Sequence, residues 1–305
     1  MTAHEISPFI VEKISLICEG YSLSKIFEMI NYNISGGKNV RFDILSHVTN
    51  NSKLCVLEED KFLVGFCMEL FHASFILSDD IVDNSLIRRN KPCFHLSRKM
   101  KALRDSRFLI SLIHKLLKTL KNNSNKLRKI IDKCFYDTCL GQAIDTKHKE
   151  RDEYTFKMYK TICELKTSSY SVYMPLACGY ILGDRDCPYY LEQLTNLIGL
   201  IYQMNDDYLN FFPEKTNKTS NDLDEYKLTY FTAKLNEENT NEKEVQSFFN
   251  KKGVSEYIKK WIFSYFEKYQ VEKKMFVEES RKMIQKEDEN DLLFLYNILK
   301  RYELN

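Results

Sequence analysis

Apolar residues recur at helical spacing along most of the 305-residue chain, and this periodicity limits the possible folds more than any other feature. The chain has only nine glycines and five prolines. Folds rich in strands need many turns, and turns use glycine and proline. The sequence therefore predicts an all-α protein that forms one domain over residues 1–305. The expected helices cover 8–32, 41–49, 58–84, 94–101, 105–120, 124–148, 153–164, 167–182, 187–212, 224–236, 243–250, 254–269 and 272–303.

Charge and cysteine usage narrow the class of protein. The 45 basic and 43 acidic residues nearly cancel, which argues against a nucleic-acid binder. The nine cysteines contain no Cys-x-x-Cys pair, so we expect reduced thiols in the cytoplasm. The most apolar segment, 62–77, contains Glu69 and His72, so we expect a buried helix and no transmembrane segment. The first residues show no signal-peptide pattern.

A first group of acids follows that apolar segment. Asp79, Asp80 and Asp83 stand at i, i+1 and i+4, so Asp79 and Asp83 lie one turn apart on one helix face. Their carboxylates repel each other unless something offsets the charge. Mg²⁺ shared with a phosphate would do so, because Mg²⁺ takes one or two carboxylates together with waters and substrate oxygens. Arg88 and Arg89 follow and suit further phosphate oxygens.

A second group of acids ends another apolar helix. Asp206 and Asp207 come after Gln203, and Asn210 lies at i+4 from Asp206. Two apolar helices that each carry paired acids suggest one site. If the two helices faced each other across a helical bundle, both pairs could hold Mg²⁺ on a single diphosphate.

With these motifs, the chain resembles the trans-isoprenyl diphosphate synthases, or polyprenyl synthetases. Five elements match that family in order over about residues 30–235. They are Gly36-Gly37-Lys38-Asn39-Val40-Arg41, Asp79-Asp80-Ile81-Val82-Asp83 with Arg88 and Arg89, Lys166-Thr167, Gln203 with Asp206-Asp207-Tyr208-Leu209-Asn210, and Lys227. The string DDIVDNSLIRRNKPCFH is most similar to the eukaryotic geranylgeranyl diphosphate synthase branch.

The resemblance implies an isoprenoid synthase-type helical bundle around a deep central cavity. It implies that isopentenyl diphosphate is joined to an allylic diphosphate, with three Mg²⁺ ions, in a homodimer or higher homo-oligomer. The implied metal ligands are Asp79, Asp80, Asp83, Asp206 and Asp207. The implied catalytic residues are Lys166, Thr167, Gln203 and Lys227. The implied substrate-binding residues are Lys38, Arg41, His72, Arg88, Arg89 and Lys218.

Spacing supports part of this assignment. His72 precedes Asp79 by seven residues, or two helical turns, so both side chains point the same way.

Phe75 lies one turn before Asp79 and should line an apolar tunnel, because water would quench an allylic cation. In the family that the chain resembles, a bulky ring at this position stops growth early, so the resemblance here implies a C15 product. Ser74 is small, however, and Ser111 and Leu112 align with aromatic floor residues of the geranylgeranyl branch. On the overall resemblance we expect the C20 product, with the C15 farnesyl product as the alternative.

Two positions depart from the family pattern. Asn90 replaces a glycine after the arginine pair, and asparagine tolerates a left-handed backbone better than most residues. Tyr226 replaces the glycine before Lys227, and its ring could displace that lysine.

The chain keeps both acidic motifs, which argues against a non-catalytic partner subunit. Phe212 stands where a terpene cyclase would carry the glutamate of its second motif. A plain helical scaffold would leave the two acid-bearing helices unexplained.

Overall fold

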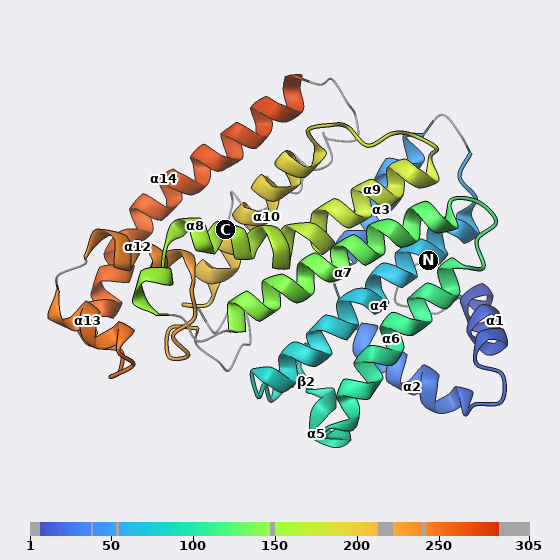
Figure 1. The fold of residues 1–305 in the computed structure, drawn as a ribbon, viewed down its shortest axis with the longest axis horizontal. Helices are drawn as coiled ribbons and strands as arrows, with labels where there is room; N and C mark the ends of the chain where they lie inside the picture. The colour runs from blue at the N-terminus through green and yellow to red at the C-terminus, as the bar shows by residue number, and fades with distance from the viewer. Residues whose placement is uncertain are drawn as a thin grey trace. The chain divides into compact units, whose positions relative to one another are not determined.

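The computed structural model confirms the all-α prediction (Figure 1). It describes residues 7–37, 39–52, 55–146, 150–212, 222–239 and 242–286, with side chains to 284. The predicted substrate-binding residues Lys38 and Lys218 lie outside these ranges. The chain divides into two compact units, and the single-domain assignment stays a prediction. Unit 1 comprises Met1–Lys133 and Met174–Pro188, and unit 2 comprises Cys134–Tyr173 and Tyr189–Asn305.

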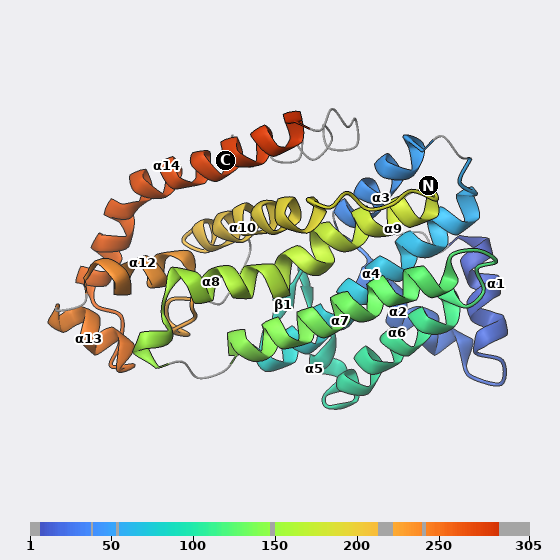
Figure 2. The ribbon, with the colours of Figure 1, turned by 45° about the horizontal axis from the view of Figure 1, so that its top comes forward.

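Unit 1 is built around a long buried helix, α4, which packs against α2, α3, α6 and α9. Figures 1 and 2 show α4 and α6 side by side. The elements of unit 1 are α1 (Pro8–Ile17), α2 (Leu23–Ile34), α3 (Val40–Asn50), α4 (Glu58–Val82), β1 (Ile87–Arg88), β2 (Lys91–Pro92), α5 (Phe94–Arg98), α6 (Lys101–Leu117), the start of α7 (Ser124–Thr146), and α9 (Met174–Leu182). Burial of most apolar side chains of α4 supplies the main driving force for this unit.

Helix α4 is also the one described helix that is long and apolar enough to cross a membrane. In the structure 67% of its apolar window is buried inside the protein. This burial agrees with the predicted core helix.

Unit 2 centres on α10, which runs against η2 and α14. Its elements are the end of α7, η1 (Arg151–Glu153), α8 (Phe156–Ile162), the π-helical η2 (Cys163–Tyr173), α10 (Leu191–Leu209), α12 (Tyr230–Glu238), α13 (Lys243–Phe249) and α14 (Glu256–Lys286). An aromatic cluster joins α8, α10, α12 and α14, with the stacked rings of Tyr208 and Tyr269 at 5.0 Å.

Several predicted helix boundaries are wrong. The predicted helix 8–32 is two helices, because the chain turns at Gly20, whose φ is +84°. The predicted helices at 254–269 and 272–303 are joined in α14, which runs through the predicted break. The break predicted at 165–166 is absent, and the π-helical η2 continues α8 without interruption.

Candidate active site

The first acidic motif occupies the last turn of α4, in unit 1. Asp79 and Asp83 are half-buried, whereas Asp80 is buried and only 3% exposed. Arg88 donates from Nε and Nη2 to one carboxylate oxygen of Asp80, over 2.9 and 2.6 Å. Burial would lower the pKa of Arg88, but these bonds and the Asp80 charge outweigh it and raise that pKa. The structure therefore gives Asp80 a protein partner.

A two-residue hairpin turn aims the two arginines in different directions. Strands β1 and β2 pair antiparallel, and Arg89 and Asn90 between them have φ of 52° and 61°. Positive φ at both central residues is the pattern of a type I′ turn. Asn90 thus adopts the left-handed backbone expected of it, and the turn survives without glycine.

Arg89 holds the end of α2. Its Nη1 donates to the carbonyl oxygens of Asn33, Ile34 and Ser35 at 3.2, 3.1 and 3.0 Å. These carbonyls lie at a helix C-terminus, where backbone acceptors lack helical partners and the dipole favours a cation. The Arg89 side chain also lies 3.6 Å from the place a Cβ would take at Gly36. Arg89 thereby fixes the stretch that leads into the glycine-rich motif.

Arg41 and His72 meet beside that stretch. Arg41 Nη2 lies 3.1 Å from His72 Nδ1, and Arg41 Nη1 lies 4.0 Å from the carboxylate of Glu69. Burial lowers the pKa of His72 well below its usual range, and the charges of Arg41, Arg89 and Arg88 lower it further. His72 is therefore a neutral imidazole in a strongly basic setting, which suits an anion.

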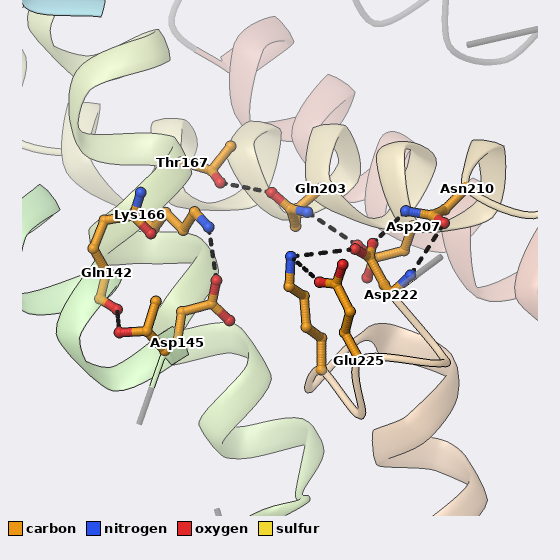
Figure 3. Close-up of polar contacts among 11 residues, drawn as sticks. Gln142, Asp145, Lys166, Thr167, Gln203, Asp207, Asn210, Asp222 and Glu225 are labelled. Carbon is orange, nitrogen blue, oxygen red and sulfur yellow. Dashed lines mark hydrogen bonds and ion pairs between the residues drawn. The ribbon is translucent and has the colours of Figure 1, made fainter. Parts of the chain in front are cut away.

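The second acidic motif occupies the last turn of α10, in unit 2 (Figure 3). Asp206 is half-buried, whereas Asp207 is buried and 3% exposed. Asp207 accepts hydrogen bonds from Gln203 Nε2 at 3.0 Å and from the Tyr230 backbone N–H at 2.8 Å. Burial raises the pKa of Asp207 to about 7, although both hydrogen bonds oppose that rise.

A hydrogen-bonded row connects two predicted catalytic residues of unit 2, Thr167 and Gln203, with Asp207 (Figure 3). Thr167 Oγ1 donates to Gln203 Oε1 at 2.8 Å, and Gln203 in turn donates to Asp207. Next to Thr167, the Lys166 ammonium contacts the carboxylate of Asp145 at 2.6 Å. Lys166 and Thr167 lie in the π-helical η2, and such wide turns are frequent at functional sites.

Two glycines let the neighbouring helices approach η2 closely. A Cβ at Gly199 of α10 would stand 2.0 Å from Ser168 Oγ and 2.7 Å from Ser168 Cα. A Cβ at Gly141 of α7 would stand 2.6 Å from the backbone nitrogen of Lys166. The backbone that carries Lys166 and Thr167 is therefore held by close contact with both helices.

Lys227 lies against acids of its own segment. Its ammonium is 2.8 Å from Glu225 and 3.6 Å from Asp222 (Figure 3). Asp222 also accepts a hydrogen bond from Asn210 Nδ2 at 2.5 Å, and its N–H donates to Asn210 Oδ1 at 3.3 Å. The third residue of the second motif thus holds the segment that carries Lys227.

The ring of Tyr226 packs away from that contact. Tyr226 has φ of 54°, the left-handed conformation that a glycine adopts easily. Its ring lies 5.2 Å from that of Phe248, and its hydroxyl accepts from the Gly253 N–H at 3.0 Å. The aromatic packing of unit 2 holds the strained backbone conformation.

The four predicted chain-length residues have different surroundings. Phe75 is buried with its ring 5.1 Å from that of Phe71. Ser74 is buried and donates to the Phe71 carbonyl at 2.7 Å. On α6, Leu112 is buried and Ser111 is exposed. Their role in product length stays a prediction.

Sequence reasoning did not find the acids that position the predicted cations. Asp145, Asp222 and Glu225 hold Lys166 and Lys227, and Glu69 lies behind Arg41. Asp145 precedes Lys166 by 21 residues, and two residues so far apart in the sequence give no local pattern that would predict the pair. For Glu69, its place inside an apolar helix was a usable signal, because a buried acid needs a partner.

Among the residues that the structure describes, no three His, Cys, Asp or Glu side chains gather as a metal-binding group. The five predicted metal ligands divide between the units, with three on α4 and its cap and two on α10. Their metal role stays a prediction.

Comparison with known proteins identifies the family. The sequence model described as polyprenyl synthetase matches residues 24–266. The chain belongs to the polyprenyl synthetase family. It is 32% identical over 228 residues to farnesyl pyrophosphate synthase 2 of Arabidopsis thaliana, and 29% identical over 235 residues to farnesyl pyrophosphate synthase of Mus musculus. These matches cover 68% and 70% of this chain and 66% of each relative, just under two thirds of their lengths.

The fold agrees with this membership. A T. brucei farnesyl diphosphate synthase complexed with minodronate superposes with a TM-score of 0.83 at 21% identity, covering 97% of this chain and 95% of that one. This likeness confirms the isoprenoid synthase-type fold of the polyprenyl synthetase. The named relatives are farnesyl synthases, so the comparisons favour the C15 alternative and do not confirm the expected geranylgeranyl branch.

Proposed function

We propose that this polyprenyl synthetase joins isopentenyl diphosphate to an allylic diphosphate and releases farnesyl diphosphate as its main product. The observation that carries the proposal is the row Thr167–Gln203–Asp207 beside the Lys166–Asp145 pair. It places in one unit three residues that the family resemblance assigned to catalysis. The farnesyl product is favoured over the geranylgeranyl product by the names of the similar proteins.

In each unit, taken by itself, the acids fit Mg²⁺ whose coordination is completed by a diphosphate. Asp79, Asp83 and Asp206 are half-buried carboxylates, whereas Asp80 and Asp207 are buried against protein donors. Mg²⁺ keeps several waters and is held by one or two carboxylates together with substrate oxygens. A site with few protein ligands therefore suits it. We therefore assign metal binding to Asp79, Asp83 and Asp206, and positioning to Asp80 and Asp207. Bound Mg²⁺ would supply positive charge where the diphosphate departs.

The remaining residues of unit 2 stabilise charge and orient the allylic substrate. Lys166 presents an ammonium whose place is set by Asp145. Gln203 has its amide oriented at both ends, because its oxygen accepts from Thr167 and its nitrogen donates to Asp207. A fixed amide and hydroxyl can place partial negative charge near a developing allylic cation without reorganisation. The proton released afterwards can be taken by the departed diphosphate.

Unit 1 would hold isopentenyl diphosphate without metal. Arg41 contacts His72, the charges of Arg41 and Arg89 both act on His72, and Arg89 Nη1 is already used to hold the stretch after α2. An arginine fork and a neutral imidazole donor together recognise phosphate oxygens in a directed way. Phe75, one turn before Asp79, would then limit chain growth at C15.

A product assay tests the proposal. The purified protein is incubated with Mg²⁺, labelled isopentenyl diphosphate and, in separate reactions, dimethylallyl, geranyl or farnesyl diphosphate. Farnesyl diphosphate as the end product from the first two starters supports the proposal. Growth of farnesyl diphosphate to C20 would overturn the product assignment, and no product from any starter would overturn the activity.

Matched variants locate the chemistry. Asp79→Ala should lower turnover by about three orders of magnitude or more, because the charge that stabilises the leaving group is lost. Glu59→Ala on the same helix removes an exposed carboxylate and should leave turnover unchanged.

Phe75→Ala should lengthen the product if the ring limits growth. The cytoplasmic location, which we predicted from the cysteine usage, remains a proposal, as does the homodimer or higher homo-oligomer that the resemblance implies.

A further inference from the structure

One buried acid of unit 1 has no part in the chemistry described so far. Glu69 lies inside α4 and is 2% exposed, and its Oε1 has no hydrogen-bond partner within the described part of the chain. Its only ion pair there is a long one, with Arg41 Nη1 at 4.0 Å. A buried carboxylate is costly unless a cation compensates it. Its position beside a subsite for an anion therefore needs a reason.

The contact between Arg41 and His72 determines the tautomer of the imidazole. An arginine guanidinium can only donate hydrogen bonds, so at 3.1 Å the Nδ1 of His72 must accept from Arg41 Nη2. A neutral imidazole that accepts at Nδ1 carries its hydrogen at Nε2. The low pKa of His72, caused first by burial and then by Arg41, agrees with a neutral ring. His72 can then offer an N–H from Nε2 to a phosphate oxygen.

Glu69 lies on the other side of the same guanidinium. Arg41 Nη1 faces Glu69 and Arg41 Nη2 faces His72, so one fork links the acid to the imidazole. The Glu69 charge also reaches Arg89, where it opposes the lowering of the pKa of Arg89 that burial causes. The subsite thus has two arginines, a neutral histidine and one buried acid behind them.

We propose that Glu69 is the positioning residue of this diphosphate subsite, acting through Arg41 to hold His72 as an Nε2–H donor. The proposal rests on the proposed function, because it takes this subsite as the one for the metal-free diphosphate. It assigns Glu69 an indirect role, since a carboxylate would repel the bound anion if it touched it.

This role predicts a result opposite to that of simple charge attraction. Removal of a negative charge near an anion subsite should strengthen anion binding if charge alone matters. Removal of the group that orients Arg41 should weaken it, because the arginine fork and the imidazole donor both lose their direction. The sign of the change therefore separates the two roles.

The test variant is Glu69→Gln, which keeps the shape and removes the charge. The matched control is Glu59→Gln, an exposed acid on the same helix. Binding of inorganic pyrophosphate is measured by titration calorimetry in EDTA, so that metal does not contribute. We expect Glu69→Gln to raise the dissociation constant about tenfold, the effect of about one charge-assisted hydrogen bond. We expect the control to match the wild type.

Two further readouts separate positioning from a general structural effect. In steady state, Glu69→Gln should raise the KM for isopentenyl diphosphate and leave the KM for the allylic diphosphate unchanged. Glu69→Asp, which keeps the charge, should recover part of the lost affinity. Nitrogen-15 NMR of the wild-type His72 ring should show the hydrogen on Nε2, and this measurement does not depend on whether any variant folds.

The outcomes are decisive in both directions. Tighter or unchanged pyrophosphate binding in Glu69→Gln, or a hydrogen on Nδ1 of wild-type His72, overturns the proposal. Failure of the wild type to bind pyrophosphate in EDTA also overturns it, even if prenyl products form. If the protein makes no prenyl product but shows the tautomer and the weaker binding in Glu69→Gln, the proposed function fails and the assignment of Glu69 to an anion subsite stands.

Discussion

The two acidic motifs use the same arrangement with different partners. Each carries a half-buried aspartate followed by a buried one, with Asp79 before Asp80 in unit 1 and Asp206 before Asp207 in unit 2. Asp80 is held by the Arg88 guanidinium. The described hydrogen bonds to Asp207 come instead from neutral donors, a glutamine amide and a backbone N–H.

The difference shows two ways to bury an acid beside a half-buried carboxylate. A nearby cation compensates the charge of a buried acid directly. Neutral dipoles compensate it only in part, and burial then raises the pKa of Asp207 to about 7. The stability of unit 1 should therefore depend on an ion pair, and the stability of unit 2 should depend on close packing and on pH.

Loss of the Arg88 guanidinium should have the largest effect on stability. Arg88→Met leaves Asp80 buried without its ion-pair partner, and we expect the free energy of unfolding to fall by about 3 kcal/mol. Urea denaturation in EDTA measures the change. The double variant Asp80→Asn with Arg88→Met should regain most of the loss, because no charge is then left unpaired. A double variant as unstable as the single one would show that packing of the arginine matters more than its charge.

Close packing should tolerate an added methyl group less well in unit 2 than in unit 1. Gly199→Ala places a methyl group 2.7 Å from the backbone of Ser168, and we expect a loss of about 2 kcal/mol in stability. Gly65→Ala in α4 meets only the ring of Phe42, at 2.2 Å, and a ring can move more easily than a backbone. Thermal unfolding compares the two. Gly199→Ala should also lower turnover, because Ser168 follows Thr167, and an equal effect of both variants would remove the contrast.

His72 of unit 1 and Asp207 of unit 2 should make the stability depend on pH in opposite directions. An unfolded aspartate ionises near pH 4, whereas Asp207 in the folded protein has a pKa of about 7. The folded state therefore binds more protons between these values, and stability falls as pH rises from about 4 to about 7. The pKa of His72 is lowered in the folded protein, so its contribution is present above about pH 6.5 and is lost as pH falls below that value.

Denaturation curves across pH 4–8 in EDTA check both signs. Asp207→Asn should remove a slope that approaches about 1.4 kcal/mol per pH unit, and His72→Gln should remove a slope of the opposite sign. If Asp207→Asn leaves the profile unchanged, Asp207 ionises in the folded protein as it does in the unfolded chain.

The two departures from the family pattern should give the smallest effects. Asn90→Gly in the exposed hairpin relieves a left-handed residue and should raise stability by a few tenths of a kcal/mol, to about 1 kcal/mol at most. Tyr226→Gly relieves similar strain but removes the ring that packs on Phe248, so we expect a net loss of about 1 kcal/mol. Chemical denaturation measures both. A gain in stability from Tyr226→Gly would mean that strain exceeds packing at this position.

Local pattern was sufficient to predict the helices that carry the two acidic motifs, but not the continuous π-helical segment that carries Lys166 and Thr167. The apolar run 62–77 predicted α4, and the acids at its end lie where the helix ends. The left-handed turn at Asn90 followed from the residue type. The boundaries near Gly20 and in α14 did not follow, because the helical spacing of apolar residues does not show where the chain turns between two packed helices.

By itself the sequence determined the fold class, the order of the motifs and the residue types that we predict to bind diphosphate and metal, because these depend on spacing within single helices. Only the tertiary structure decided which aspartate of each pair turns inward, how Lys166 meets Asp145 and how Glu69 lies behind Arg41. Those contacts join separate elements, and packing between elements selects them. The same packing makes one buried acid depend on an arginine and the other on a glutamine and a backbone N–H.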